Sequence, residues 1–509
     1  MSDLGAIFQV LWRSPRYLKA GFILAREGVF ADVDPEILPP PLRPFFGLLR
    51  RVARKGAAQQ REALARAMAR LGPSYVKLGQ VLAARPDIVG ARASRDLELL
   101  QDRMEPFARA RAVEIVEAAF GRKIDELFIT FGEPVAAASI AQVHRARVRD
   151  EDGEHDVAVK ILRPGVEARF RRDLTDMAHA AAFAEQHSAE ARRLRLTEVV
   201  ETVARSVRLE MDFRLEASAA SEFSANTAGD PDFRTPRVDW DRTARAVLTV
   251  EWIDGIPLSD IAAVAAAGHD PKKVARTIIQ SFLRQALRDG FFHADMHQGN
   301  LFVDREGRLA AVDFGIMGRL GTKERRFLAE ILYGFIVKDY RRVAVVHFEA
   351  GYVPRHHAVE EFTQAIRAIG EPIHARRADQ ISMARLLTLL FEITGLFDMR
   401  TRPELLLLQK TMVVVEGVGR KFDPQLDMWT TAEPVVRGWI EENLGPAGKL
   451  KDANATVGAA LAMLARAPQL IDKFEALGTP AVSPPDPWAR RMTYALWALV
   501  VVVVLAIFS

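Results

Sequence analysis

The spacing of hydrophobic residues predicts a chain that is mostly helical. Val199, Val203 and Val207 recur every four positions, which places them on one face of a helix that we expect to continue to Ser218. A second helix is predicted for residues 274–287, where apolar residues recur at the same spacing. Segments with helical periodicity therefore account for much of the predicted fold.

Two short segments instead have the composition of strands. Residues 156–162, DVAVKIL, are rich in β-branched residues, and residues 246–250, AVLTV, form a second such run that a turn follows. Helices together with separate strands indicate an α+β fold.

The C-terminal segment from Met492 to Phe508 carries no charge. Its length is near the lower limit of about 17 residues for a transmembrane helix. Arg490 and Arg491 precede it, and basic flanks favour the cytoplasmic side of a membrane. We therefore expect a single-pass anchor. The alternative is a buried C-terminal helix, although Val500–Val504 is apolar on every side.

Composition narrows the classes of function. The 509 residues are 49% hydrophobic, which permits a substantial core and more than one domain. The 70 basic and 66 acidic residues nearly balance, so nucleic acid is not an expected partner. The lack of cysteine excludes disulfides, thiolate chemistry and cysteine-ligated zinc. We expect no signal peptide, because residues 4–12 are apolar only briefly and lack a basic leader.

The most informative stretch is HADMHQGN, residues 293–300, followed by AVDFG, residues 311–315. Protein kinases carry H-R-D-L-x-x-x-N and then D-F-G in this order. We therefore predict that Asp295 orients the nucleophile, and that Asn300 and Asp313 hold Mg²⁺ on the phosphates of ATP.

A kinase-like site also needs groups upstream that hold the phosphates. Lys160, on the first predicted strand, matches the V-A-I-K pattern, although an ordinary surface lysine is the alternative. Ala136, Ala137, Ala138 and Ser139 stand where a kinase has its glycine-rich loop. Alanine resists positive φ, so we expect a stiffer loop that binds the nucleotide differently from an ordinary protein kinase.

Three carboxylates in the first predicted helix are candidates to pair with Lys160: Glu210, Asp212 and Glu216. The alternative is a solvated charged face, and any such pairing requires an insertion between the strand and this helix.

The second predicted strand lies where a kinase-like chain has its adenine-binding hinge. We expect backbone groups from Glu251 to Ile253 to meet the adenine edge, with a plain core strand as the alternative.

The peptide platform of protein kinases is missing. Kinases follow D-F-G with a long segment that ends in A-P-E, whereas residues 316–321 lead directly into a predicted helix with Thr322 as its N-cap. A protein substrate is therefore not expected.

A zinc site is a further interpretation, because His293 and His297 have H-x-x-x-H spacing. It is disfavoured, because Ala294 stands where zincins have a glutamate and the segment is expected to be a loop.

Taken together, these motifs resemble the UbiB family, bacterial relatives of the mitochondrial coenzyme Q kinase-like ATPases. The deciding motif is K-x-G-Q in residues 73–87, with Lys77, Gly79 and Gln80 in place. Other motifs that match in the family's order are Leu100–Arg103, the alanine-rich loop, Glu210–Asp212 with Glu216, the catalytic loop and Glu416–Arg420.

The resemblance implies roles that spacing alone does not. In this family the K-x-G-Q segment covers the place of a peptide substrate, which implies that Lys77 points toward Glu210 and Asp212. It also implies that Glu216 pairs with Lys160, and that the alanine-rich loop favours hydrolysis over protein phosphorylation. Members support ubiquinone biosynthesis and act at membranes.

We accordingly predict an α+β, protein-kinase-like fold of two lobes with an N-terminal helical K-x-G-Q extension and a C-terminal membrane helix. The predicted parts are the extension at 1–120, an N-lobe with a helical insertion at 121–255, a C-lobe at 256–445, a helical and proline-rich linker at 446–487 and a transmembrane anchor at 488–509.

The leading hypothesis is a membrane-anchored, Mg²⁺-dependent ATPase that couples hydrolysis of ATP to ADP to the access or extraction of lipophilic ubiquinone precursors. The alternatives are a small-molecule or lipid kinase and a nucleotide-gated scaffold. Expected partners are those precursors, anionic membrane lipids and ubiquinone-biosynthesis enzymes, and a homodimer is allowed. The expected location is the bacterial inner membrane, with the catalytic domain in the cytoplasm.

Overall fold

The computed structural model describes residues 15–29 and 62–445, apart from short gaps at 84–85, 98–99, 101–103, 152, 375–388, 390–392, 394 and 400–402. The chain divides into two compact units, Met1–Trp439 and Ile440–Ser509. All the predicted site residues belong to the first unit.

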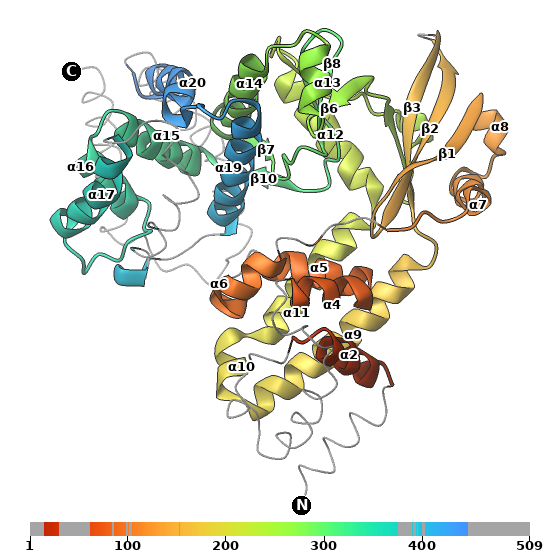
Figure 1. Ribbon diagram of the computed structural model, residues 1–509, viewed down its shortest axis with the longest axis horizontal. Helices are drawn as coiled ribbons and strands as arrows, with labels where there is room; N and C mark the ends of the chain where they lie inside the picture. The colour runs from red at the N-terminus through yellow and green to blue at the C-terminus, as the bar shows by residue number, and fades with distance from the viewer. Residues whose placement is uncertain are drawn as a thin grey trace, which may run out of the picture. The chain divides into compact units, whose positions relative to one another are not determined.

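An antiparallel sheet in the order β1-β2-β3-β5 forms the centre of the predicted N-lobe (Figure 1). Alternate residues of β3, including Val157 and Val159, are buried in a core that helices α7 and α8 complete. Because successive side chains of a strand point to opposite faces, Lys160 projects from the other face of the sheet. These elements are β1 Thr130–Ala137, β2 Ala141–Asp150, β3 Gly153–Leu162, β5 Val247–Glu251, α7 Arg109–Phe120 and α8 Ile124–Leu127.

The predicted insertion between strand and helix is present, and it packs on the N-terminal helices. Val203 and Val207 of the insertion share a buried cluster with Leu78 and Val81 of the K-x-G-Q helix. Ser74 of that helix also donates a hydrogen bond of 2.7 Å to Asp173. The insertion is α9 Val166–His187, α10 Ala189–Leu194 and α11 Leu196–Glu210; the N-terminal helices are α2 Pro15–Arg26, α4 Ala63–Leu71, α5 Pro73–Ala83 and α6 Pro86–Leu97.

The single helix predicted through Ser218 is wrong in one respect. The valine stripe is buried on α11 as expected, but α11 ends at Glu210 and a new helix, α12, runs from Phe213 to Thr227. Asp212 starts this helix, because its side chain accepts a hydrogen bond of 3.2 Å from the backbone N–H of Arg214. Hydrophobic periodicity continues across this break and therefore does not show it.

The C-lobe is mainly helical. Helix α14, Pro271–Arg284, continues into a π-helical turn, η5, Gln285–Asp289, and ends at Gly290. Gly290 has a left-handed φ of 65°, and a Cβ there would lie 2.6 Å from the carbonyl oxygen of Leu320, so only glycine fits. This turn directs the chain into the predicted catalytic loop.

Short strands, a 3-10 turn and six further α-helices complete the described part of the chain. Two small sheets have the orders β4-β9-β8-β6 and β10-β7. The elements are β4 Phe233–Arg234, η4 Trp240–Arg242, β6 Gly255–Pro257, α13 Ile261–Ala266, β7 Phe291–His293, β8 Leu301–Asp304, β9 Leu309–Ala311, β10 Met317–Arg319, α15 Thr322–Ile336, α16 Tyr340–Glu349, α17 Val359–His374, α19 Pro403–Phe422 and α20 Met428–Leu444.

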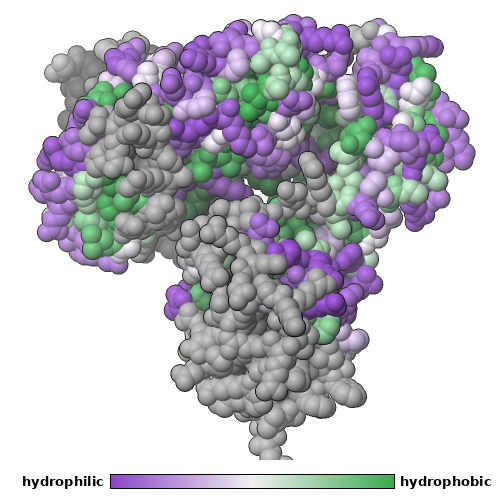
Figure 2. Space-filling view, viewed as in Figure 1, coloured by the Kyte–Doolittle hydropathy of each residue, from purple (hydrophilic) through white to green (hydrophobic). Residues whose placement is uncertain are grey.

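Within the described ranges, no helix has both the length and the apolar character needed to span a bilayer. The predicted span at 492–508 and the predicted linker at 446–487 lie outside those ranges. On the face drawn in Figure 2, hydrophilic residues predominate over the described surface, with hydrophobic residues in smaller groups.

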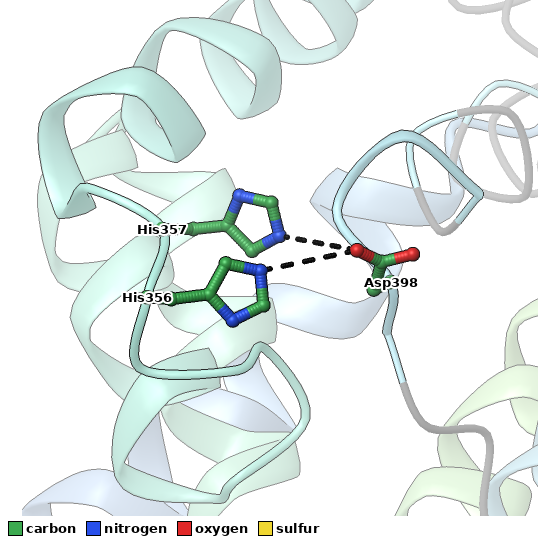
Figure 3. Close-up of side chains that lie close together, drawn as sticks. All are labelled: His356, His357 and Asp398. Carbon is green, nitrogen blue, oxygen red and sulfur yellow. Dashed lines mark ion pairs between the residues drawn. The ribbon is translucent and has the colours of Figure 1, made fainter.

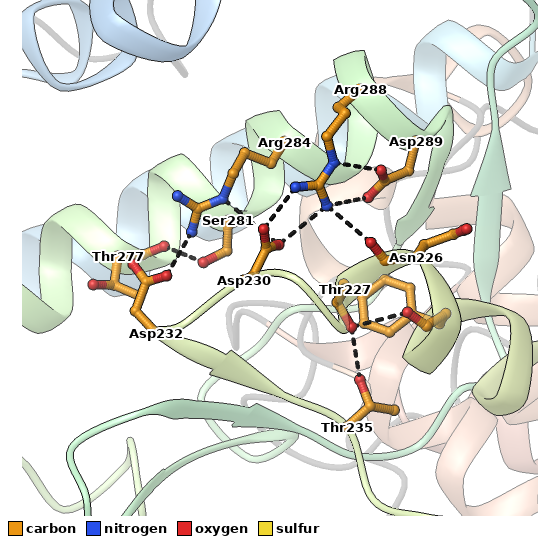
Figure 4. Close-up of polar contacts among 11 residues, drawn as sticks. Asn226, Thr227, Asp230, Asp232, Thr235, Thr277, Ser281, Arg284, Arg288 and Asp289 are labelled. Carbon is orange, nitrogen blue, oxygen red and sulfur yellow. Dashed lines mark hydrogen bonds and ion pairs between the residues drawn. The ribbon is translucent and has the colours of Figure 1, made fainter.

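A network of charged side chains fastens the segment after α12 to α14 and η5 (Figure 4). Asp230, whose side chain is 6% exposed, accepts hydrogen bonds of 2.6 and 3.1 Å from Arg288. Arg288 also donates to the carbonyl oxygen of Asn226, and Arg284 donates to Asp232 at 3.0 Å. A buried carboxylate needs such partners, so the network holds α12 against the helix that leads into the catalytic loop.

We predict that Arg288→Ala lowers the free energy of unfolding by about 1–3 kcal/mol, because the buried Asp230 loses its closest partner. Urea denaturation of the purified chain measures this change. Arg305→Ala is the matched control, since Arg305 pairs with Asp254 at an exposed site, and we expect a change within about 0.5 kcal/mol. Equal losses for the two variants would contradict the importance of the network.

Candidate active site

Three charged side chains meet beside the N-lobe sheet. Nζ of Lys160 lies 2.8 and 3.0 Å from the carboxylate oxygens of Glu216 on α12, and 3.0 Å from Oδ1 of Asp313. The side chains of Lys160 and Glu216 are 16% and 9% exposed, whereas that of Asp313 is 50% exposed. One ammonium group is therefore shared by a buried carboxylate and a carboxylate that is open to solvent.

The charged groups of this cluster shift one another's pKa values. Burial, reinforced by the nearby charge of Asp313, raises the pKa of Glu216 to about 7, although the charge of Lys160 opposes this shift. Burial alone would lower the pKa of Lys160, but Asp313 and Glu216 outweigh it and raise that pKa. Partial desolvation would raise the pKa of Asp313, but the charge and hydrogen bond of Lys160 outweigh it and hold that pKa well below its usual range.

The backbone of Asp313 adopts a strained conformation. Its φ is +63°, in the left-handed region that residues other than glycine rarely adopt. The next residue, Phe314, is buried, with its ring 5.3 Å from that of Phe223 on α12 and 5.4 Å from that of His293. This packing holds the strained conformation and keeps Asp313 against Lys160.

The predicted catalytic loop follows β7 as a compact irregular segment. The side-chain amide of Asn300 donates to the carbonyl oxygen of Asp295 at 3.1 Å and to its carboxylate at 3.4 Å. The backbone N–H of Asp295 donates to Nδ1 of His293 at 3.1 Å, and Nε2 of His293 lies 3.1 Å from the carbonyl oxygen of Val312. His293 is therefore neutral with its proton on Nε2, and burial lowers its pKa.

The donor set in this region suits a divalent cation. Two carboxylates share the single positive charge of Lys160, so negative charge is in excess. The amide nitrogen of Asn300 bonds to Asp295, which leaves its side-chain oxygen as the atom for a cation. Carboxylate and amide oxygens are ligands that Mg²⁺ accepts, so Asp313 and Asn300 fit the predicted metal site.

The alanine-rich segment is a tight turn between two strands. Ala136 and Ala137 pair with β2 as the end of β1, and the N–H of Ala138 donates to the carbonyl oxygen of Ala141 at 2.8 Å. Ser139 is buried in the turn. The segment is therefore restrained by its place in a β-hairpin, in addition to the resistance of alanine to positive φ.

Two residues from other segments hold this turn. The N–H of Met104 donates to the carbonyl oxygen of Ala137 at 3.1 Å, and Nε of Arg163 donates to that of Ala138 at 2.7 Å. Sequence analysis missed both, because neither a methionine N–H nor an arginine after a strand carries a signal for such a role. The carbonyl groups of Ala137 and Ala138 are thus already bonded within the protein.

The predicted hinge is partly occupied by protein contacts. The N–H of Glu251 donates to the carbonyl oxygen of Arg237 at 2.8 Å, and the N–H of Trp252 donates to that of Asp156 at 3.0 Å. The side chain of Glu251 accepts from Arg234 at 2.5 Å, and Ile253 is buried. Because the Glu251 N–H is already bonded, an adenine at this position would have to bond to other backbone groups.

The K-x-G-Q lysine meets one of its two expected partners. Nζ of Lys77 lies 2.5 Å from Oε1 of Glu210, and both side chains are largely buried. The same oxygen accepts a hydrogen bond of 2.9 Å from Ser206. Asp212 instead binds the side chain and backbone of Arg214, which lowers the pKa of its carboxyl group.

Packing explains the glycine of the motif. A Cβ on Gly79 would collide with the side chain of Leu100 and lie 3.2 Å from that of Leu97. Gly79 therefore permits the close packing of α5 within the N-terminal helices, and Gln80 lies half-buried on the same helix. The glycine at position 79 thus serves the packing of these helices.

The segment after D-F-G is as short as predicted. Helix α15 begins at Thr322, so residues 315–321 are all that separate it from Phe314. The N-cap is Gly321 rather than Thr322, which is the first helical residue and accepts a hydrogen bond from Arg325.

The zinc interpretation is wrong. His293 ends β7 and His297 lies in the loop that follows, so the two do not share a helical face. Nδ1 of each ring accepts a backbone N–H, from Asp295 and Gly299. Nε2 of the buried His293 faces the carbonyl oxygen of Val312, so this ring has no nitrogen left for a metal ion.

Another group of ligand-type side chains is His356, His357 and Asp398 (Figure 3). Nε2 of His356 and of His357 lie 3.9 and 3.7 Å from the same oxygen of Asp398. Because Asp398 and His356 are exposed, this grouping alone does not identify a metal site.

Comparison with known proteins agrees with this geometry. Residues 99–347 match the ABC1 atypical kinase-like domain, and residues 366–427 match the UbiB helical domain. The chain is 37% identical over 502 residues to a Marinobacter nauticus protein named probable protein kinase UbiB, which covers 97% of this chain and 89% of that protein.

A solved structure is similar as well. The complex of Rv3197 with erythromycin from Mycobacterium tuberculosis aligns with a TM-score of 0.51 and 23% identity, over 71% of this chain and 91% of that one. This likeness supports the fold.

We predict that Lys77 and Glu210 are coupled energetically. Lys77→Met and Glu210→Gln should each destabilise the protein, because each leaves a largely buried charge without its partner. The double variant should lose about 1–3 kcal/mol less than the sum of the two single losses. Urea denaturation of all four proteins measures this coupling, and additive losses would show that the pair contributes nothing.

Proposed function

This chain belongs to the UbiB family of ABC1 atypical kinase-like proteins, and from that premise we propose that it is a Mg²⁺-dependent, membrane-associated ATPase that supports ubiquinone biosynthesis. Hydrolysis of ATP gives lipophilic quinone precursors access to the enzymes that modify them. The observation that carries the proposal is the placement of Lys160 between Glu216 and Asp313.

Each group then has one task in phosphoryl transfer. Lys160, held by Glu216, contacts the phosphates, while Asp313 and Asn300 hold Mg²⁺, which neutralises charge on the phosphates when bound. Asp295 orients the attacking water, and its alignment depends on the hydrogen bond that its N–H donates to His293 and on the one that its carbonyl oxygen accepts from Asn300. The alanine turn at 136–139 and the backbone near Ile253 border the nucleotide.

Several contacts argue against a protein substrate. The short segment before α15 offers no platform for an extended peptide. The K-x-G-Q helix is tied to α11 by the pair of Lys77 with Glu210. We propose that this helix, which carries Gly79 and Gln80, regulates access to the site together with Asp212 at the start of α12. A small or lipophilic acceptor remains compatible with both features.

Exposed apolar residues next to site residues support a lipophilic partner. Leu209 precedes Glu210, Leu215 precedes Glu216, and Ile316 follows Gly315, and all three side chains are exposed. Contiguous exposed apolar patches mark surfaces that bind apolar ligands, and we propose these three residues as members of such a surface. The same residues favour a lipid or small-molecule kinase as the second candidate function.

We predict that the purified full-length protein in anionic liposomes releases phosphate from γ-labelled ATP, and that a phenolic mimic of a quinone precursor increases the rate. Asp313→Asn should lower the rate about 100-fold or more, because it removes a carboxylate ligand of the cation. Chelation of Mg²⁺ by EDTA should have the same effect.

Other outcomes of this assay would replace the proposal. Label on the phenol or on a lipid would identify a small-molecule or lipid kinase. Nucleotide binding without any turnover would identify a nucleotide-gated scaffold.

We also predict that Lys160→Met weakens ATP binding by roughly tenfold to a hundredfold, which corresponds to about 1.5–3 kcal/mol for hydrogen bonds to a charged group. Titration of a fluorescent ATP analogue measures this affinity. Lys272→Met on the exposed start of α14 serves as the control, and unchanged affinity in Lys160→Met would place the phosphates elsewhere.

A further inference from the structure

Ala294 and the predicted catalytic Asp295 are held at all four of their polar backbone atoms. The N–H of Ala294 donates to the carbonyl oxygen of Ile316 at 3.0 Å, and the N–H of Asp295 donates to Nδ1 of His293 at 3.1 Å. The carbonyl oxygen of Asp295 accepts from Asn300 at 3.1 Å. These three bonds arise within residues 293–316.

The fourth bond comes from a distant part of the chain. The hydroxyl group of Thr411, on α19, donates to the carbonyl oxygen of Ala294 at 3.0 Å. Thr411 is 1% exposed, and α19 lies in the region that matches the UbiB helical domain. The helical domain therefore reaches the peptide bond directly before Asp295.

The single proton of the Thr411 hydroxyl group has two acceptors within reach, because the same oxygen also lies 2.9 Å from the carbonyl oxygen of Leu407, one turn earlier in α19. The Leu407 carbonyl already has a backbone partner in the hydrogen-bond ladder of the helix. The carbonyl oxygen of Ala294, by contrast, is at a buried residue and would lose its partner without Thr411.

Helix α19 is itself held firmly enough to act as a support. A Cβ on Gly419 would lie 2.8 Å from Leu426 and 3.7 Å from both the carbonyl oxygen of Ala275 and the side chain of Ile279, so α19 packs closely on α14. Near its C-terminal end, Lys421 donates to the side chain of Gln298 at 3.2 Å. Two side chains of α19 thus contact the catalytic loop.

We propose that Thr411 is a positioning residue, which fixes the plane of the Ala294–Asp295 peptide and thereby the direction of the Asp295 carboxylate. Through Thr411, the helical domain orients the Asp295 carboxylate for phosphoryl transfer. This inference rests on the proposed function, because it assumes that Asp295 orients the nucleophile.

Loss of the Thr411 hydroxyl should affect the orientation of Asp295 but not the binding of the nucleotide. In the described part of the chain, Lys160, Glu216 and Asp313 form no hydrogen bond or ion pair with α19, so loss of the Thr411 hydroxyl should leave nucleotide binding intact. The Ala294 carbonyl would rotate toward another donor, and Asp295 would turn with the peptide. A shift of about 1 Å at a catalytic group can lower a rate about 100-fold.

The test compares Thr411→Val, which keeps the shape but lacks the hydroxyl, with Thr411→Ser, which keeps the hydroxyl. Thr431→Val is the matched control, because Thr431 is buried on α20 and its hydroxyl bonds to Asp427 within the same helix turn. ATP turnover by the full-length protein in anionic liposomes gives kcat and KM, and hydrogen exchange of residues 291–300 reports the loop directly.

We expect Thr411→Val to lower kcat by about tenfold to a hundredfold, with the KM for ATP within about twofold of the wild type. Hydrogen exchange of residues 291–300 should be faster in this variant. Thr411→Ser should restore both properties, and Thr431→Val should change neither.

Equal effects of Thr411→Val and Thr431→Val, or a raised KM with unchanged kcat, would overturn the proposal. Absence of turnover in the wild type would refute the proposed function instead. In that case hydrogen exchange still tests the role of Thr411, because unchanged exchange of residues 291–300 in Thr411→Val would mean that Thr411 does not hold the loop.

Discussion

The ammonium group of Lys160 is the point on which the rest of this structure depends, because it joins three elements that are far apart in sequence. It contacts Glu216 on α12 and Asp313 in the D-F-G segment, and each contact requires support from elsewhere. The cap at Asp212 starts α12 at the right place, and the arginine network after α12 fastens that helix to the C-lobe. The burial of Phe314 holds the strained backbone of Asp313. An excess of negative charge results, which a divalent cation would offset.

The surroundings of this cluster are restrained by bonds within the protein. The alanine turn is bonded through its carbonyl groups to Met104 and Arg163, and the K-x-G-Q helix is bonded through Lys77 to Glu210. On the C-lobe side, the predicted catalytic loop is fixed by its own backbone and by α19. Restraint on all these sides favours a small reacting group such as water over a peptide, since peptide transfer needs a platform that the short segment before α15 does not provide.

Sequence analysis predicted the parts of this arrangement that are encoded locally. Asp295, Asn300, Asp313 and Lys160 stand in short motifs whose spacing is set by one loop or one strand, and the family resemblance supplied Glu216 as the partner of Lys160. The break between α11 and α12 was not predicted, because apolar periodicity runs across it and only the capping geometry of Asp212 reveals it. Arg163 and Thr411 were not found either, since each acts through a backbone carbonyl group, which leaves no pattern in side-chain spacing.

The most direct test of this account is diffraction from crystals of the full-length protein soaked with Mn²⁺ and a non-hydrolysable ATP analogue. Anomalous scattering locates the manganese independently of the nucleotide. The account predicts a peak within coordination distance of the Asp313 carboxylate and the side-chain oxygen of Asn300, with Lys160 still bonded to Glu216 and in contact with a phosphate. Nucleotide density with no manganese at these two residues, or with Lys160 turned away from the phosphates, would contradict it.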